Sequence, residues 1–214
     1  MSKPVLHNPD CRACPRLSTF LDDTARDHPS YFCKPVPPFG IDKPHLLVVG
    51  LAPGMHGANR TGRPFTGDYA GVLLYETLHT FGFATHAVSE SATDGLKLIG
   101  ARITNAVKCL PPQNKPEPAE VRNCNSFLAA ELAALKPGTA VLALGAISHG
   151  AILRAARLKA SAAKFEHGAQ HALPNGCALF DSYHCSRYNT NTRRLTPEMF
   201  RDVFKAIRAY LDRS

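Results

Sequence analysis

Four short apolar segments alternate with amphipathic helical patterns along the 214-residue chain, and this alternation restricts the fold more than any other feature. The apolar segments have the length and character of buried strands, at residues 45–50, 101–107, 139–144 and 177–182. Helical patterns separate or follow them, at residues 69–82, 118–136, 146–157 and 197–212. Strands that alternate with helices favour a parallel sheet covered on both faces. We therefore predict a three-layer α/β/α fold around a four-stranded parallel sheet.

The length and composition fit a single domain over residues 1–214. With 44% hydrophobic residues the chain can bury one sizeable core, and nothing in it requires a second one. Residues 85–98 and 158–176 are expected to be long surface connections, and residues 163–173 are a candidate for a small hairpin.

The charge and the apolar pattern suggest where the protein acts. A formal charge of +8, from 25 Lys and Arg against 17 Asp and Glu, favours a polyanionic partner such as nucleic acid, although many basic proteins bind none. The amino-terminal residues lack the apolar core of a signal peptide. The most apolar later stretch, residues 140–153, is interrupted by Ser148 and His149 and is too short to span a bilayer. We expect a cytoplasmic or nucleoid-associated protein that is not secreted and has no membrane partner.

Residues 50–68, GLAPGMHGANRTGRPFTGD, connect a predicted buried strand to a predicted helix. The loop therefore lies at the carboxyl end of a strand, where open α/β sheets bind their ligands. It narrowly misses the phosphate-binding pattern G-x-x-x-x-G-K-[ST], because Arg63 replaces the lysine and Pro64 removes the hydroxyl that would hold magnesium. No G-x-G-x-x-G follows the strand either. We reject a nucleotide-binding loop.

A second polar segment leaves the last predicted strand at the same edge of the sheet. Its His184 can donate a hydrogen bond to an anion that develops on a ligand, while Ser186, Arg187 and Asn189 supply phosphate-type contacts. One histidine among ten is most often a surface residue. The significance of His184 comes from sharing this edge with the glycine-rich loop and with Asn105, at the end of the second strand.

Four of the seven cysteines indicate a metal centre. Cys11 and Cys14 form a C-x-x-C pair, while Cys109 ends the second strand and Cys124 falls in the first turns of the next helix. Four thiolates suit a [4Fe–4S] cluster or a structural zinc. A redox function for C-x-x-C is disfavoured because nothing strand-like precedes Cys11. For Cys109 and Cys124 a second interpretation stays open, that they are merely small buried hydrophobic residues.

Together these residues resemble the uracil-DNA glycosylase superfamily, and within it the type B (family 5) enzymes. The resemblance covers more than half of the chain, at residues 11–17 with 31–40, 50–71, 103–131 and 165–199. It implies the family's four-stranded α/β/α fold and uracil-containing DNA, in single or double strands, as substrate. It also implies that a [4Fe–4S] cluster is held by Cys11, Cys14, Cys109 and Cys124.

The resemblance assigns the flipped base to four residues. Phe65 would stack on the base, and the Asn105 amide would read its Watson–Crick edge. Leu51 and Ala52 would complete the substrate site. Because many members of the superfamily carry a polar catalytic residue at the position of Leu51, the apolar residue favours type B over type A.

The chemistry is assigned to His184 and Asp68. His184 would stabilise the departing base as an anion, and Asp68 would activate water or stabilise the positive charge that develops on the sugar. A simpler interpretation of Asp68 stays open, since an aspartate directly before a helix caps its first amides. Arg187, with Ser186 and Asn189, would enter the groove and hold the duplex open.

The expected function is base-excision repair by a monomeric glycosylase that flips uracil and hydrolyses its N-glycosidic bond. Type B resemblance implies a broader substrate range, with hypoxanthine and xanthine as candidates. Two alternatives remain: a uracil-restricted type A (family 4) enzyme, and a non-catalytic DNA-binding protein that holds zinc or an iron–sulfur cluster. One departure has no explanation from the sequence, namely Cys185, where relatives often have proline or a small aliphatic residue.

Overall fold

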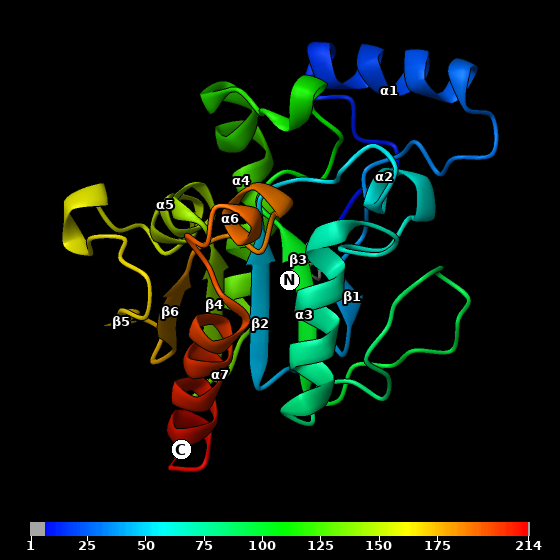
Figure 1. Cartoon of the computed structure of the whole chain (residues 1–214). Coiled ribbons are helices and arrows are strands. Elements are labelled where there is room, and N and C mark those ends of the chain that lie inside the picture. The colour runs from blue at the N-terminus through cyan, green and yellow to red at the C-terminus, as the bar shows by residue number, and fades with distance from the viewer. Residues whose placement is uncertain (1–6, 214) are drawn as a thin grey trace.

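The computed structural model describes residues 7–213, and its strands form one six-stranded sheet in the order β1-β3-β2-β4-β6-β5 (Figure 1). The four predicted strands are present and parallel, as β2 (Leu46–Gly50), β3 (Ala101–Asn105), β4 (Ala140–Leu144) and β6 (Ala178–Ser182). Two short antiparallel strands extend the edges, as β1 (Phe39–Gly40) and β5 (Gln170–Ala172). The predicted α/β/α class and its parallel sheet are confirmed, and the complete sheet is two strands wider.

Helices cover both faces of the sheet. α3 (Tyr69–Thr80) and α7 (Pro197–Leu211) share one hydrophobic core with Leu46 and Val48 of β2. α4 (Pro118–Ala133) and α5 (Ala146–Ala155) share the other core with Leu47 and Val49. Successive residues of a strand point to opposite faces, so the uninterrupted apolar run of β2 supplies both cores.

Three of the longer helices, α3, α4 and α7, begin where the sequence provides side-chain capping groups. Asp68 caps α3, and Thr196 caps α7 by accepting a hydrogen bond from the Met199 amide at 3.2 Å. Glu117 and Glu120 form a capping box at the start of α4. Each cap satisfies amide groups that the first helical turn leaves without a partner.

Three helices lie where the sequence analysis expected none. α2 (Ala58–Thr61) and α6 (Arg187–Asn191) are single short turns of helix beside the carboxyl ends of the strands (Figure 1). α1 (Pro15–Asp27) begins at a proline, directly after Cys14. Arg16 fixes α1 to α4 through its Nη2 atom, which lies 2.8 Å from Oε2 of the buried Glu120.

The two long connections are more ordered than expected. In the second connection, η2 (Ala160–Ala162) forms a 3₁₀ turn, and in the first, Leu98 forms an isolated antiparallel bridge with Ala84. Another 3₁₀ turn, η1 (Pro112–Asn114), lies in the loop between β3 and α4. The candidate hairpin within residues 163–173 is wrong, because β5 pairs with β6 and the hairpin therefore spans residues 170–182. Among the described residues, no helix combines the length and apolar character needed to cross a membrane.

Candidate active site

A cavity of about 300 Å³ lies at the carboxyl ends of β2, β3 and β6, where the sequence predicted a ligand site. Eight of the nine residues predicted to bind substrate or DNA, or to catalyse, line it: Leu51, Ala52, Phe65, Asp68, Asn105, His184, Ser186 and Arg187. The ninth, Asn189, lies behind the wall, where its Nδ2 atom donates a hydrogen bond to the His184 carbonyl at 2.8 Å.

The Phe65 ring and the Asn105 amide meet above Gly50. Gly50 is paired with Asn105 in the parallel register of β2 and β3. A Cβ atom on Gly50 would lie 2.4 Å from Asn105 Oδ1 and 2.6 Å from the Phe65 ring. Only glycine leaves room for both groups at the end of β2.

The backbone of Phe65 is held in an unusual conformation. Its φ of 55° lies in the left-handed region, which a bulky side chain seldom adopts. The next helix packs closely against it, since a Cβ atom on Gly71 would lie 1.8 Å from the Phe65 carbonyl oxygen. Strain of this kind persists where the surrounding structure fixes the residue, often at a binding site.

Asn105 carries a buried polar atom without a partner. Its side chain is buried, and its Oδ1 atom makes no hydrogen bond with any described residue. An unsatisfied buried acceptor costs about 1–3 kcal/mol. A ligand with an N–H group in the cavity would satisfy Asn105 Oδ1.

Asp68 occupies the position of a helix cap and also lines the cavity. Its Oδ1 atom accepts a hydrogen bond from the Gly71 amide at 2.8 Å, so the capping interpretation is confirmed. Its Oδ2 atom lies on the side of Gly54 and Gly57, where a Cβ atom on Gly57 would approach it to 2.5 Å. Burial raises the pKa of Asp68, although the Gly71 and Ala70 amides oppose this shift. The cap therefore uses one oxygen and leaves the other beside the glycine-rich loop.

His184 faces Phe65 across the cavity, with the two ring centroids 6.0 Å apart. Burial lowers the pKa of His184 to about 4, so its imidazole is neutral at pH 7. A contact that the sequence did not predict fixes the backbone just before it: the Tyr183 amide donates to His167 Nδ1 at 3.1 Å, and the two rings stack. The preceding loop and β6 thus position the His184 segment together.

Arg187 and Tyr69 form a stacked pair at the mouth of the cavity. The Arg187 guanidinium carbon lies 5.0 Å from the centroid of the Tyr69 ring. The Tyr69 hydroxyl accepts a hydrogen bond from Thr190 Oγ1 at 3.1 Å, which links α3 to α6. Tyr69 was not among the residues predicted for the site, although its place directly after Asp68 was an available signal.

The four predicted cysteine ligands line one small cavity of about 130 Å³. Two come from the segment directly before α1, Cys11 and Cys14, and two from the β3–α4 connection and α4, Cys109 and Cys124. The Lys108 amide donates to Cys124 Sγ at 3.3 Å. Burial raises the pKa of Cys109 to about 12, so a bound metal would have to displace its proton.

The remaining cysteines lie apart from this cavity. Cys185, which the sequence left unexplained, is fully buried in the core formed with α3 and α7. It acts there as a small hydrophobic residue. Cys177 is buried in the opposite core, and Cys33 accepts a hydrogen bond from Asn59 Nδ2 at 3.5 Å.

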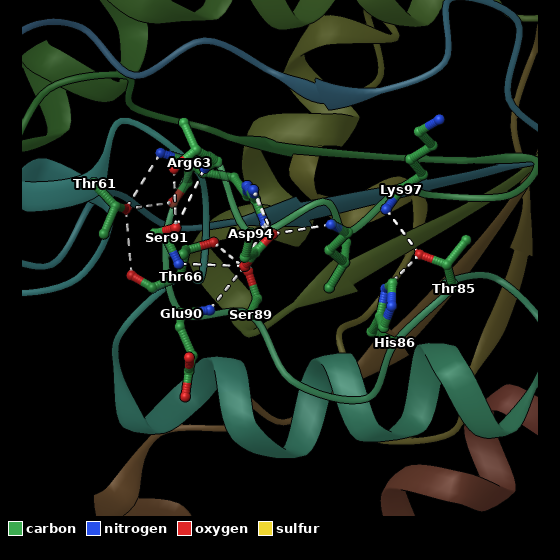
Figure 2. A network of polar contacts seen from close by, with 12 residues as sticks. Thr61, Arg63, Thr66, Thr85, His86, Ser89, Glu90, Ser91, Asp94 and Lys97 are labelled. Carbon is green, nitrogen blue, oxygen red and sulfur yellow. Dashed lines mark hydrogen bonds and ion pairs between the residues drawn. The ribbon is translucent and has the colours of Figure 1, made fainter.

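An ion pair between the buried Arg63 and the partly exposed Asp94 fixes the glycine-rich loop to the connection at residues 85–98 (Figure 2). Arg63 is buried, and its Nη1 and Nη2 atoms both lie 2.9 Å from Asp94 Oδ1. The Asp94 carboxylate also accepts hydrogen bonds from the amides of Glu90 and Leu96, at 2.9 and 3.0 Å. The sequence analysis noted Arg63 only as a departure from a phosphate-binding pattern and overlooked this pairing.

Asp181, the acid of the second polar segment, does not line the cavity. It is fully buried in β6, where it lies 2.8 Å from His149 Nδ1 and 3.2 Å from His171 Nε2. These hydrogen bonds satisfy both carboxylate oxygens and connect β6 to α5 and β5. Within residues 7–213, Asp68 is the acid that the cavity exposes to a ligand.

Comparison with known proteins identifies relatives along most of the chain. The family model described as the uracil DNA glycosylase superfamily matches residues 37–208. A type-5 uracil-DNA glycosylase of Thermus thermophilus is 46% identical over 199 residues, which cover 90% of each chain. A type-5 uracil-DNA glycosylase of Pyrobaculum aerophilum is 42% identical over 200 residues, covering 92% of this chain and 87% of the relative.

Type-4 relatives match a shorter part of the chain. A type-4 uracil-DNA glycosylase of Archaeoglobus fulgidus is 37% identical over 107 residues, which cover 50% of this chain and 46% of the relative. The sequence identity and the coverage are both lower than for the type-5 proteins. The resemblance predicted from the sequence is therefore confirmed, and the type-5 relatives are the more similar.

Proposed function

Because the chain belongs to the uracil DNA glycosylase superfamily, we propose that the cavity at the sheet edge holds a uracil flipped out of DNA. The protein is a uracil-DNA glycosylase of base-excision repair, which hydrolyses the N-glycosidic bond of deoxyuridine. A base in the stack is inaccessible, so it must be extruded at a cost of about a few kcal/mol. The aromatic wall and polar groups of the cavity offset that cost.

The unpartnered oxygen of Asn105 carries this assignment of the cavity. Uracil has one ring N–H between two carbonyl groups, and Asn105 Oδ1 is a buried acceptor without a protein partner. The amide oxygen accepts from that N–H while the amide nitrogen donates to the neighbouring carbonyl. Phe65 stacks on the base from the Gly50 side, and Leu51 and Ala52 provide apolar walls.

His184 stabilises the departing base. Breaking the glycosidic bond leaves negative charge on uracil, and a neutral imidazole can donate one hydrogen bond to it. The pKa of about 4 keeps His184 neutral, so it acts as a hydrogen-bond donor rather than as a cation. A donor aimed at developing charge in a water-poor site contributes about 3 kcal/mol to the transition state.

Asp68 acts on the sugar side of the same bond. Bond cleavage builds positive charge on the sugar and requires a water molecule, and a carboxylate can stabilise the first and orient the second. The cap uses Asp68 Oδ1, which leaves Oδ2 for this role. Helix capping and catalysis are therefore concurrent roles of one side chain.

Arg187 and Ser186 hold the DNA at the mouth of the cavity. Arg187 is exposed and lines the cavity beside the backbone path of the flipped nucleotide. Asn189 supports this segment from behind through the His184 carbonyl, so its contribution to DNA binding is indirect. We further propose that the enzyme binds DNA as a monomer and associates with the nucleoid, and light scattering of the free and DNA-bound protein tests the first point.

The four-cysteine cavity fits a [4Fe–4S] cluster. A tetrahedral zinc with bonds of about 2.3 Å would draw the four sulfurs to about 3.8 Å from one another. Within residues 7–213, three or more possible ligand atoms lie within 4.8 Å of one another in one group alone, which consists of His149, His171 and Asp181. The four cysteine sulfurs do not form such a group, so they lie farther apart than a zinc ion would hold them. The wider spacing of the sulfurs favours the larger cluster. When bound, the cluster supplies a structural link between the start of α1 and α4.

The base assignment is tested with single-turnover excision assays on uracil, hypoxanthine and xanthine in single and double strands. We expect excision of uracil and of at least one deaminated purine, whereas a type A enzyme would excise uracil alone. Asn105→Leu should lose uracil excision by about fivefold to a hundredfold, because it removes hydrogen bonds of about 1–3 kcal/mol to the base. If Asn105→Leu excises uracil at the wild-type rate, Asn105 has no part in base recognition.

The cluster is tested by metal content. Protein purified without oxygen should be brown and contain iron and acid-labile sulfide, and zinc without iron would overturn the assignment. Cys14→Ser should lose iron and fold less stably, because the ligands connect segments far apart in the sequence. Cys33→Ser is the matched control, since Cys33 is also half-buried but lies outside the four-cysteine cavity, and it should retain iron.

A further inference from the structure

A second groove opens beside the base cavity, and we propose that it binds the nucleotide adjacent to the flipped one in the damaged strand. The groove has a volume of about 630 Å³ and shares Asp68, Tyr69 and Arg187 with the cavity. One phosphodiester joins the flipped nucleotide to its neighbour, so a groove that shares the cavity wall lies within reach of that neighbour. The inference rests on the proposed function and adds a second subsite to it.

The groove offers the surfaces that an unpaired base requires. Tyr69 is 41% exposed, and its ring is held in place by the Arg187 guanidinium and by the Thr190 hydroxyl. Val72 and Val88, which are 65% and 63% exposed, add apolar surface on the two sides of the groove. A fixed aromatic ring beside apolar groups binds any base by stacking, without selecting its identity.

The charges of the groove suit a phosphate on one side. Within the described part of the chain, the Arg60 guanidinium makes one hydrogen bond, a long one of 3.5 Å from Nη2 to the Gly67 carbonyl. Its other donors, with those of Arg187, are available to a phosphate. Glu90 lies in the opposite wall, so the phosphate belongs on the arginine side and the base lies across Tyr69.

The groove is rigid because buried contacts join its two walls. One wall is the end of the glycine-rich loop, and the other is residues 87–90 of the following connection. Thr66 Oγ1 lies 2.8 Å from Ser89 Oγ, and the Gly67 amide donates to the Ser89 carbonyl at 3.2 Å. Figure 2 shows the contact between Thr66 and Ser89 continuing into the Arg63–Asp94 ion pair. Because the groove is already formed in the free protein, less conformational entropy is lost when DNA binds.

Three single-stranded oligonucleotides test the proposal. Each carries one 2′-fluorinated deoxyuridine, whose glycosidic bond resists cleavage, and two of them lack the base on its 5′ or its 3′ neighbour. For the wild-type enzyme, removal of one of these two neighbouring bases should raise Kd about fivefold or more, since stacking on an aromatic ring is lost. Removal of the other base should change Kd less.

The Val88→Asp variant tests whether the groove causes this rise in Kd. It places a negative charge in the groove without touching the base cavity, so the complete oligonucleotide should bind about as weakly as the one lacking the sensitive base. For Val88→Asp, removing the sensitive base should then raise Kd no further. Tyr188→Ala is the control, because Tyr188 is an exposed aromatic residue next to Arg187 that does not line the groove, and it should retain the wild-type difference.

Two results would overturn the proposal: equal Kd values for all three oligonucleotides with the wild-type enzyme, or a difference that persists in Val88→Asp. Failure of the proposed function would look different. An oligonucleotide with thymidine at the centre would then bind as tightly as the one with fluorinated deoxyuridine, whatever the neighbouring bases do.

Discussion

A single carboxylate at the start of α3 has a structural role and, as we propose, a chemical one. Asp68 caps the helix through Oδ1, and burial raises its pKa in the folded protein. A carboxyl group with a raised folded pKa binds its proton more tightly in the folded state. Its contribution therefore favours folding at low pH and is lost as the pH rises through the folded pKa. At pH 7 the charged form of Asp68 is a cost to stability, which the proposed catalytic role would explain.

Asp68→Asn separates the two roles, because asparagine caps nearly as well but carries no charge. We expect an unchanged or higher melting temperature, near-normal DNA binding and a loss of about a hundredfold or more in single-turnover excision. Thermal melting and rapid-quench assays on one preparation measure both effects. If the variant excises uracil at the normal rate, Asp68 is a cap only, and the water must be held by other groups.

The pH dependence of excision should be determined by Asp68 rather than by His184. The rate should rise with pH through the raised pKa of Asp68, and His184 should add no step of its own in the ordinary histidine range, because burial lowers its pKa to about 4. His184→Ala should be slower by about a hundredfold and should keep the Asp68 dependence. A rate step near pH 6.5 that disappears in His184→Ala would instead show that an imidazolium acts in the reaction.

The connection at residues 85–98 depends on the Arg63–Asp94 ion pair for its conformation. Burial acts to raise the pKa of Asp94, but hydrogen bonds from Arg63 and from backbone amides outweigh it and hold the pKa well below its usual range. A depressed folded pKa contributes stability above the unfolded value of about 4, and that stability is lost as the pH falls further. Acid should therefore weaken this connection first.

Asp94→Asn leaves the buried Arg63 without a charged partner. We expect a loss of about 3 kcal/mol in the free energy of unfolding, measured by urea denaturation at pH 7. The matched control is Asp42→Asn, which breaks an Arg–Asp pair whose acid is exposed, and it should cost under about 1 kcal/mol. Equal losses for the two variants would show that the low exposure of the Asp94 carboxylate does not decide how much the pair contributes to stability.

Elements with a long periodic pattern could be predicted, and elements that depend on a partner could not. α7 and α4 were found from apolar spacing and capping signals that lie within each helix. β1 is two residues long and exists because it pairs with β3, and the short α2 and α6 are likewise held by neighbouring segments. Their sequences contain no independent signal for a strand or helix.

The same distinction applies to the site. Phe65, Asp68, Asn105 and His184 follow strands whose carboxyl ends must share one edge, so their meeting could be expected. The pairing of Arg63 with Asp94 joins residues 31 positions apart through a connection that has no periodic pattern. A single sequence shows which residues follow strands, but it does not show how an irregular connection folds back.

For the whole molecule, the charge of +8 predicts salt-sensitive binding to DNA. The affinity for undamaged duplex should fall steeply as salt rises, with a log–log slope of about −0.9 for each phosphate contacted. Arg187→Ala should make that slope less steep by about the amount expected for one lost phosphate contact. The control is Arg26→Ala, which changes an exposed arginine of α1 paired with Asp23 and should leave the slope unchanged. Fluorescence anisotropy between 50 and 200 mM salt, as an approximate range, measures the slopes. An affinity that ignores salt would contradict the electrostatic interpretation.

The sequence positions of the four cysteines also determine the order in which they leave the ribosome during synthesis. Half of its sulfur atoms belong to residues 11–14 and the other half to residues 109–124. At a translation rate of about 5–20 residues per second, Cys14 leaves the ribosome roughly 5–20 s before Cys124. During that interval the first two thiols have no enclosing wall. Oxidants and competing metals can reach them in the nascent chain, so we expect loading of the proposed cluster to be most vulnerable before the protein is complete.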